Sequence, residues 1–207
     1  MQPFTRLAAP ACPLPVANVD TDQLIPARFM KRSRAEGYGG YLLHDMRFAD
    51  DSAPRPDFPL NRAEHAGAQI LVARRNFGAG SSREAAVYAL VDYGIRCVVA
   101  PSFGDIFASN AVNNGLLPAR VAEADAETLL TAVAGGGELT IDLEAQTVAD
   151  GGTVFPFMVD PVWRLKLLNG WDDIDLTLNY GQDIAAFAEA DRAARPWAAP
   201  RTPPAAR

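Results

Sequence analysis

The sequence predicts an α/β fold with a mostly parallel central sheet, flanking helices and a small β extension. Apolar runs typical of strands alternate with runs typical of helices between residues 68 and 137, and this alternation indicates a parallel sheet with crossover helices. Residues 138–159 have the pattern of a short antiparallel hairpin instead. The chain has 207 residues, 49% of them hydrophobic, which is enough for one substantial core. We therefore expect a single domain over residues 1–195, followed by a proline-rich, disordered tail over residues 196–207.

Prolines dominate the interpretation of the N-terminal part of the chain. Residues 1–15 contain four of them and are expected to form an irregular lead-in. Residues 17–30 mix polar and apolar positions, and Pro26 excludes a helix interior, so we expect a strand edge or a loop. Residues 28–58 are rich in glycine, proline and charge. We expect this segment to bury little and to be mobile in the isolated chain.

The elements from residue 68 onward follow from strand and helix patterns that end at turn residues. Strands are expected over three apolar segments: 68–74, 96–102 and 116–121. Helices that stop at asparagine or glycine are expected over three others: 82–94, 105–115 and 122–137. The hairpin should turn at Asp150 and Gly151, and residues 161–195 should be helical with breaks at Gly170 and Gly181.

Composition excludes several classes of protein. A net charge of -6 argues against a nucleic-acid surface and against attachment to anionic lipid. No apolar run approaches the roughly 20 residues of a membrane span, and the N-terminus lacks the pattern of a signal peptide, so we expect a soluble cytoplasmic protein. Two cysteines and two histidines are too few to hold a structural zinc or an iron-sulfur cluster, so any such cofactor must lie on a partner chain. Cys97, inside an apolar run, is expected to be a buried hydrophobic residue rather than a reactive thiol.

The stretch NFGAGSSREAA, residues 76–86, joins a predicted strand to a predicted helix. In a parallel sheet such a loop binds anions, because backbone N–H groups and the helix N-terminus point outward there. Gly78 and Gly80 are expected to let a ligand approach the backbone closely. Three polar side chains suited to a carboxylate follow them: Ser81, Ser82 and Arg83. The sequence therefore predicts a site for a small anion.

Other interpretations of this loop stay open at this point. Ser81 and Glu84 have the spacing of a capping box, which would stabilise the helix by roughly 1 kcal/mol without any ligand. Ser102 and Asp105 have the same spacing after the next predicted strand, and we interpret that pair as mainly structural. A dinucleotide loop, a P-loop and a serine hydrolase all fit poorly, because the third glycine, the lysine and the G-x-S-x-G pattern are absent from this stretch.

Two further polar clusters lie earlier in the chain. The stretch VDTD places Asp20 and Asp22 on either side of Thr21, and it could be no more than a turn, since these side chains bond their own backbone. The stretch KRSR, residues 31–34, lies beside a glycine-rich patch and could be a solvated charged loop. Local pattern alone does not decide either case.

Taken in order, the stretches NVDTDQLIPARFMKR, NFGAGSSREAA and SFGDIFASNAVNNGLLP resemble successive motifs of the 3-isopropylmalate dehydratase small subunits of the aconitase superfamily. The resemblance spans about residues 4–190. It implies a swivelling β/β/α domain that docks, as a heterodimer, on a separate large subunit holding a [4Fe-4S] cluster. It also implies isomerisation of 2-isopropylmalate and 3-isopropylmalate through 2-isopropylmaleate in leucine biosynthesis.

The same resemblance implies roles for individual residues. Ser81 would be the general base that removes the carbon-bound proton, and Asp22 would belong to the active-site hydrogen-bond network. The remaining implied contacts are to the substrate: Ser82 and Arg83 would hold a carboxylate, and Lys31 and Arg32 would cover the substrate and help to choose its side chain.

The chain departs from the family pattern at three places. Ala79 and Ala85 stand where the family usually has cysteine and histidine, and Val87 and Tyr88 stand where Pro-Trp is common. These departures leave open a paralogue that acts on citramalate or citraconate, maleate or a methylated malate. A non-catalytic swivel domain that only binds its partner, and a self-sufficient binding protein for small acids, are further alternatives.

Overall fold

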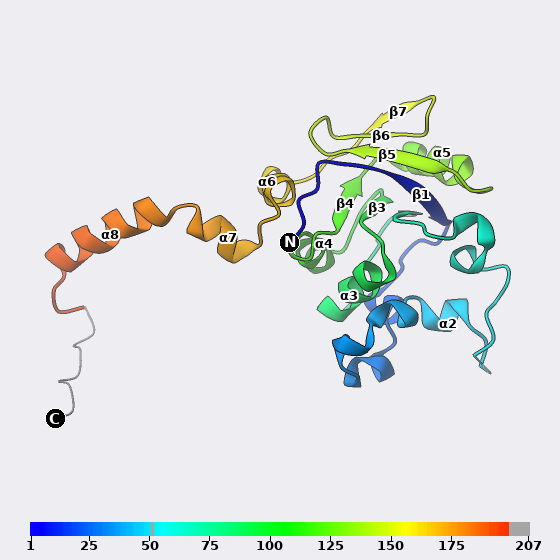
Figure 1. Cartoon of the computed structure of the whole chain (residues 1–207), viewed down its shortest axis with the longest axis horizontal. Coiled ribbons are helices and arrows are strands. Elements are labelled where there is room, and N and C mark those ends of the chain that lie inside the picture. Colours follow the sequence, from blue (N-terminus) through cyan, green and yellow to red (C-terminus); the bar gives the residue numbers. More distant parts are fainter. Residues whose placement is uncertain (51, 199–207) are drawn as a thin grey trace. The chain divides into compact units, whose positions relative to one another are not determined.

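A seven-stranded mixed sheet forms the centre of the computed structural model, which describes residues 1–50 and 52–198. Its strand order is β4-β3-β2-β1-β5-β6-β7. The strands are β1 (Arg6–Leu14), β2 (Ile70–Ala73), β3 (Cys97–Ala100), β4 (Leu117–Arg120), β5 (Glu138–Asp142), β6 (Thr147–Ala149) and β7 (Val154–Pro156). Strands β1 to β4 pair in parallel, and β5 to β7 add an antiparallel extension beside β1 (Figure 1). The predicted α/β class, parallel centre and β extension are confirmed.

Eight α-helices and several single 3-10 turns are present in the described residues. The helices are α1 (Thr21–Leu24), α2 (His44–Arg47), α3 (Glu84–Tyr93), α4 (Asp105–Asn113), α5 (Glu123–Ala132), α6 (Pro161–Asn169), α7 (Asp173–Leu178) and α8 (Gly181–Ala194). The 3-10 turns are Ala27–Lys31, Arg34–Glu36, Tyr38–Tyr41, Pro59–Asn61 and Ala63–His65. The strands and helices predicted between residues 68 and 159 are therefore confirmed, as is the break at Gly170. The second break falls at Asn179 and Tyr180 instead, and Gly181 is the first residue of α8.

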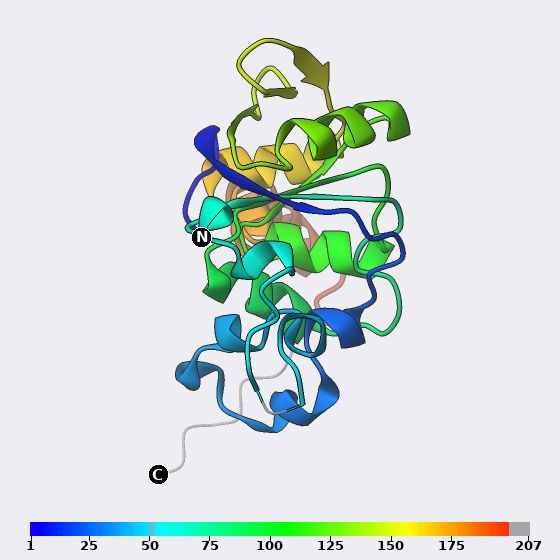
Figure 2. The same ribbon diagram turned by 90° about the vertical axis from the view of Figure 1, so that its right-hand side faces the viewer.

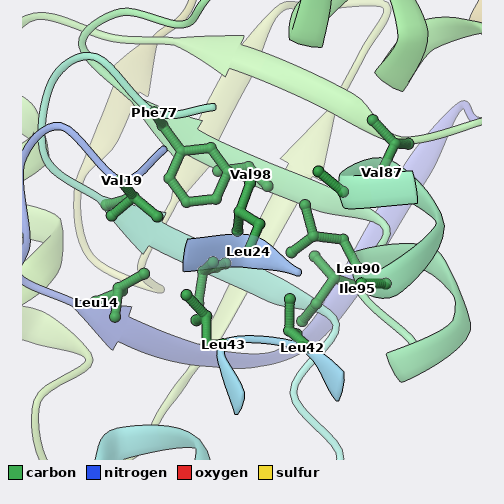
Figure 3. Close-up of a cluster of buried hydrophobic side chains, with 14 of the residues drawn as sticks. Leu14, Val19, Leu24, Leu42, Leu43, Phe77, Val87, Leu90, Ile95 and Val98 are labelled. Carbon is green, nitrogen blue, oxygen red and sulfur yellow. The ribbon is translucent and has the colours of Figure 1, made fainter. Parts of the chain in front are cut away.

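The central strands are buried on both faces, which is the usual state of a parallel sheet. Along β2, Leu71 and Ala73 enter one core, which α1 and α3 cover. Ile70 and Val72 enter a second core, to which α5 and α6 contribute. Figure 3 shows the first core, with Leu90 of α3 packed toward the sheet. Alternate side chains of one strand thus stabilise both layers of helices.

The N-terminal residues form a long strand, so the predicted irregular lead-in is wrong over β1. Residues Arg6–Pro10 pair with β5, and residues Ala11–Leu14 pair with β2. The Ala11 N–H donates to the Gly137 carbonyl, just before β5. Backbone nitrogens alternate in direction along a strand, so that of Pro13 also faces the β5 side, after the last pair with β5, and that of Pro10 faces the β2 side, before the first pair with β2. Neither proline therefore removes a hydrogen bond of the ladder, and prolines are tolerated at such positions. This strand joins the parallel sheet to the antiparallel extension.

Residues 17–30 contain a short helix, so the predicted strand edge or loop is wrong over α1. Asp20 caps this helix: its Oδ1 accepts a hydrogen bond from the Gln23 N–H at 2.7 Å. The Gln23 side chain in turn accepts from the Asp20 N–H at 2.9 Å. This reciprocal capping box makes so short a helix possible. Pro26 lies just beyond it, as its missing N–H requires.

The segment 28–58 buries more than its composition suggests. Leu42 and Leu43 are fully buried in the first core, and Tyr38 is almost so. Figure 2 shows these blue segments gathered at the end of the molecule opposite the β6–β7 hairpin. The expectation that this segment supplies little to bury is therefore wrong, while its mobility in the isolated chain stays a prediction.

The chain divides into two compact units, Met1–Asp172 and a second that begins at Asp173. Helices α7 and α8 make up most of the described part of the second unit, and neither contains a buried residue. The predicted domain limit at residue 195 stays untested, and residues 199–207 of the predicted tail lie outside the described residues. No helix in the described part of the chain is long and apolar enough to cross a membrane.

Candidate functional site

The loop of residues 76–83, called the site loop below, leaves the carboxyl end of β2 and leads into α3. Hydrogen bonds hold it on two sides. The Phe77 N–H donates to the Ser102 carbonyl at 3.0 Å, and the Gly78 N–H donates to the Val19 carbonyl at 2.7 Å. The segments that follow β3, β2 and β1 thus stay side by side beyond the ends of the strands. Their hydrogen bonds fix the backbone of the site loop.

Thr21 ties the helix α1 to the site loop. Its side chain is 2% exposed, and its hydroxyl donates to the Ser81 carbonyl at 3.0 Å. Its backbone N–H donates to the Ala79 carbonyl at 2.9 Å. These two bonds span Gly80 and set the direction of the backbone at Ser81. Sequence reasoning assigned no role to Thr21, and its place between Asp20 and Asp22 was the one signal that could have found it.

Asp22 and Arg83 form a hydrogen-bonded ion pair across this junction. The Arg83 side chain is 21% exposed and the Asp22 side chain 55% exposed, so the pair lies at the edge of the solvent. A carboxylate beside a guanidinium fixes the plane of the donor fork, and the fork can bind a second anion through its other N–H groups. The structure therefore unites Asp22, Ser81 and Arg83, which the sequence places in two distant motifs.

Ser81 does not cap the following helix, so the predicted capping box with Glu84 is wrong. Helix α3 begins at Glu84 itself, and its N-cap residue is Arg83, which makes no side-chain capping bond. Glu84 accepts a hydrogen bond from Asn114 Nδ2 at 3.0 Å instead. Ser81 and Ser82 are both exposed. Their hydroxyls are thus available at the surface for a ligand.

The second predicted cap is also wrong, because Ser102 supports the site loop rather than α4. The N-cap residue of α4 is Gly104, which has no side chain, and Asp105 is the first residue of the helix. The Ser102 hydroxyl accepts a hydrogen bond from the Asn76 N–H at 2.8 Å. This bond fixes the first residue of the site loop to the loop that follows β3.

Two glycines of the site loop have different roles. Both have positive φ angles, +73° at Gly78 and +98° at Gly80. A Cβ on Gly78 would lie 2.2 Å from Cγ of Phe107, so Gly78 packs against that ring, and its role in ligand approach stays a prediction. A Cβ on Gly80 would meet nothing closer than Thr21 Oγ1 at 3.5 Å. Gly80 therefore lies at ordinary contact distance from α1, without the close approach found at Gly78.

Lys31 and Arg32 lie outside this cluster. Lys31 ends a 3-10 turn, and both side chains are exposed. The Arg32 guanidinium lies 3.6 Å from the Glu36 carboxylate and 5.7 Å from the centre of the Tyr41 ring. Within residues 1–50 and 52–198 neither side chain contacts the site loop. Their predicted role in covering the substrate stays a prediction.

The remaining departures from the family pattern lie on or beside α3. Ala85 is in its first turn and packs, partly buried, against the first core. Tyr88 is one turn further along, and the Arg34 guanidinium lies 3.7 Å from the centre of its ring. Burial raises the pKa of Tyr88. Ala85 thus supplies no polar group to the first turn of α3, while Tyr88 contacts an arginine from another segment.

A hollow of about 1050 Å³ lies away from these residues, between the end of β1, residues 46–59 and α5. Its lining is mainly apolar and includes neither Ser81 nor Arg83. This hollow and the polar cluster are therefore separate features. Ser81 and Ser82 are thus open to solvent and lie outside this hollow.

The two cysteines do not form a cofactor site. Cys12 and Cys97 are both buried. Burial raises the pKa of the Cys12 thiol to about 12 and also raises the pKa of Cys97, so both are protonated at neutral pH. In the part of the chain that the structure describes, no group of three or more His, Cys, Asp or Glu side chains could hold a metal ion. The residues present do not fit an iron-sulfur cluster, and Cys97 is a buried hydrophobic residue, as predicted.

Comparisons with known proteins agree with this arrangement. The aconitase C-terminal domain family matches residues 1–124, and the LeuD_N family matches residues 127–161. The chain is 50% identical to a 3-isopropylmalate dehydratase small subunit from Rhodospirillum centenum, over 96% of this chain and 99% of that one. It is 46% identical to another from Agrobacterium fabrum, over 96% and 100%. A solved structure of a 3-isopropylmalate dehydratase from Methanocaldococcus jannaschii is similar in fold, with a TM-score of 0.65 at 24% identity over 87% of this chain and 98% of that one.

Proposed function

Because the chain belongs to the family of 3-isopropylmalate dehydratase small subunits, we propose that it serves the interconversion of 2-isopropylmalate and 3-isopropylmalate through 2-isopropylmaleate in leucine biosynthesis. The observation that carries this proposal is the ion pair between Asp22 and Arg83 beside the exposed Ser81. It places a donor fork for a carboxylate next to a hydroxyl at the carboxyl end of a parallel strand, where ligands of such sheets bind.

We further propose that a large subunit completes the enzyme as a heterodimer in the cytoplasm. A small subunit implies such a partner, and the exposure of Ser81 and Ser82 agrees with a site that a second chain closes. The [4Fe-4S] cluster of the family would belong to that chain, because the two cysteines here are buried. Neither chain would then turn over substrate alone.

The chemistry proposed for this chain is the removal and return of one proton. Ser81 Oγ would take the carbon-bound proton, and loss of the hydroxyl from the neighbouring carbon would leave the double bond of 2-isopropylmaleate. Water added with the opposite orientation would give the isomer. A serine hydroxyl is a weak base, so the Arg83 charge and the N-terminus of α3 would have to stabilise its alkoxide.

Arg83 and Ser82 would bind one substrate carboxylate, while Asp22 holds the guanidinium in place. Charge-assisted hydrogen bonds of this kind fix both position and orientation. The relatives are named for isopropylmalate, which favours this substrate over the related diacids that Ala79 and Ala85 left open. The exposed polar cluster also speaks against a swivel domain without any catalytic role.

Substitution of Ser81 tests the proposal in a purified complex with the large subunit. Ser81→Ala should abolish isomerisation, while the two chains still co-purify with their cluster intact. The neighbouring Ser82→Ala is the matched control, because it should raise KM and leave measurable turnover. Near-normal turnover by Ser81→Ala would remove this serine from the mechanism.

A further inference from the structure

The segment Arg32–Tyr41 is fastened to α3 through one carboxylate, that of Asp92. Its Oδ1 accepts a hydrogen bond from Arg34 Nη2 at 3.1 Å, and its Oδ2 accepts from the Tyr38 N–H at 3.1 Å. The Asp92 side chain is only 20% exposed. Both oxygens are thus used to hold residues from a segment more than 50 positions away in the sequence.

Tyr88 adds a second contact from the same helix. The Arg34 guanidinium lies 3.7 Å from the centre of its ring, a distance at which the positive charge is attracted to the ring face. Tyr88 and Asp92 are four residues apart and therefore share one face of α3. Arg34 is held between the two side chains.

The backbone of the segment also lies directly on α3. A Cβ on Gly39 would lie 2.6 Å from the Asp92 carbonyl oxygen, so no side chain fits there. The buried Tyr38 reaches back, and its hydroxyl donates to the Arg32 carbonyl at 2.8 Å. A continuous path of contacts therefore runs from Asp92 through Tyr38 to Arg32.

We propose that Asp92, Tyr88, Arg34 and Tyr38, called the latch, position Lys31 and Arg32 relative to the site loop and so help to set the substrate's side-chain specificity. The reason is geometric: α3 carries Tyr88 in its middle and Asp92 near its end, and the site loop leads directly into its start. One rigid helix thus sets the places of both groups. These are positioning residues, and their effect on specificity rests on the function proposed above.

The latch is tested in the complex with the large subunit by Asp92→Ala. Its matched control is Glu127→Ala, which breaks a carboxylate–arginine pair, with Arg74 at 2.6 Å, on another helix. Asp92→Ala should raise KM for isopropylmalate by ~10-fold, with kcat changed by less than about twofold, as expected when only uniform substrate binding is lost. It should also lower the ratio of kcat/KM for isopropylmalate to kcat/KM for citramalate. Glu127→Ala should change neither KM nor this ratio.

Hydrogen exchange supplies a readout that does not depend on activity. Amides of residues 32–41 should lose protection in Asp92→Ala but keep it in Glu127→Ala. If Asp92→Ala does not fold, Arg34→Gln, whose side chain is 44% exposed, replaces it with the same expected changes. Unchanged KM, preference and protection in the folded variant would overturn the latch. An intact wild-type complex that converts no isopropylmalate would instead overturn the proposed function, and it would leave the exchange result as the test of the latch contacts.

Discussion

Replacement of Gly78 by alanine should destabilise the chain much more than the same change at a glycine with equal backbone geometry. Gly78 has a φ of +73°, and Gly67 has a φ of +72°. An added Cβ at Gly67 would meet nothing within 4 Å, whereas at Gly78 it would lie 2.2 to 2.6 Å from three ring carbons of Phe107. The pair therefore separates the cost of a left-handed backbone from the cost of a clash.

The magnitudes follow from these two terms. The backbone term alone is about 1–2 kcal/mol and applies to both variants. Contacts between carbon atoms are normally about 3.5–4.0 Å long, so the Phe107 ring must move by more than about 1 Å to admit the methyl group. That ring packs against Phe77, with centres 5.4 Å apart, and stacks on Phe103 at 6.5 Å. Overpacking of this kind costs about 1–3 kcal/mol more, which gives about 2–5 kcal/mol for Gly78→Ala.

Urea unfolding of the two variants and the wild type measures this difference. The midpoints give the losses in unfolding free energy, and equal m-values show that the compared states are the same. In the double variant Gly78→Ala/Phe107→Ala the clash is absent. Its loss in unfolding free energy should therefore be smaller than the sum of the losses in the two single variants, by about the clash term. Equal losses at Gly67 and Gly78 would refute the argument that Gly78 is required by Phe107.

The remaining predictions concern other parts of the first unit. Thr21→Val removes the hydroxyl that donates to the Ser81 carbonyl, and it should lower kcat of the complex by about fivefold to tenfold. Thr21→Ser keeps the hydroxyl and should retain activity. Equal kcat in the two variants would contradict the role of that hydroxyl. Both cysteines should react with a thiol reagent only as fast as the chain unfolds, because their pKa values are raised by burial; rapid labelling of the native chain would contradict this. The hydrogen bond from the Arg28 guanidinium lowers the pKa of Asp45 to about 2. The small contribution of this exposed pair to stability is therefore present above the ordinary pKa of the carboxyl and is lost as pH falls toward 2. Unfolding free energies of wild type and Asp45→Asn should therefore converge as pH falls, and a constant gap would contradict the assignment.

Periodic segments could be predicted from the sequence, because each carried its own signals. The run Ile70–Ala73 is apolar throughout and is buried on both faces of the sheet. Helix α3 ends at Gly94, whose φ of +111° suits a glycine. Strand β1 could not be predicted in this way. Its prolines suggested a loop, and only the pairing with two different partners explains why they are tolerated.

The candidate site shows where local spacing fails. Ser81 and Glu84 have the spacing of a capping box, but the helix starts at Glu84, and the serine is left exposed. Asp22 and Arg83 were each predicted as site residues from separate motifs. Their ion pair could not be predicted, because it depends on how β1 and β2 lie side by side. Similarly, the buried Tyr38 could not be inferred from a glycine-rich segment. In each case the outcome depends on contacts between residues that are far apart in the sequence.

Isomerisation by the reconstituted complex tests the central claim most directly. The chain is purified anaerobically with its large subunit, given 2-isopropylmalate, and followed by the ultraviolet absorbance of the unsaturated diacid and by separation of the two isomers. We expect the wild-type complex to form both 2-isopropylmaleate and 3-isopropylmalate, and Ser81→Ala to form neither although it binds the large subunit equally well. An intact wild-type complex that converts no isopropylmalate, or a Ser81→Ala complex as active as wild type, would contradict it.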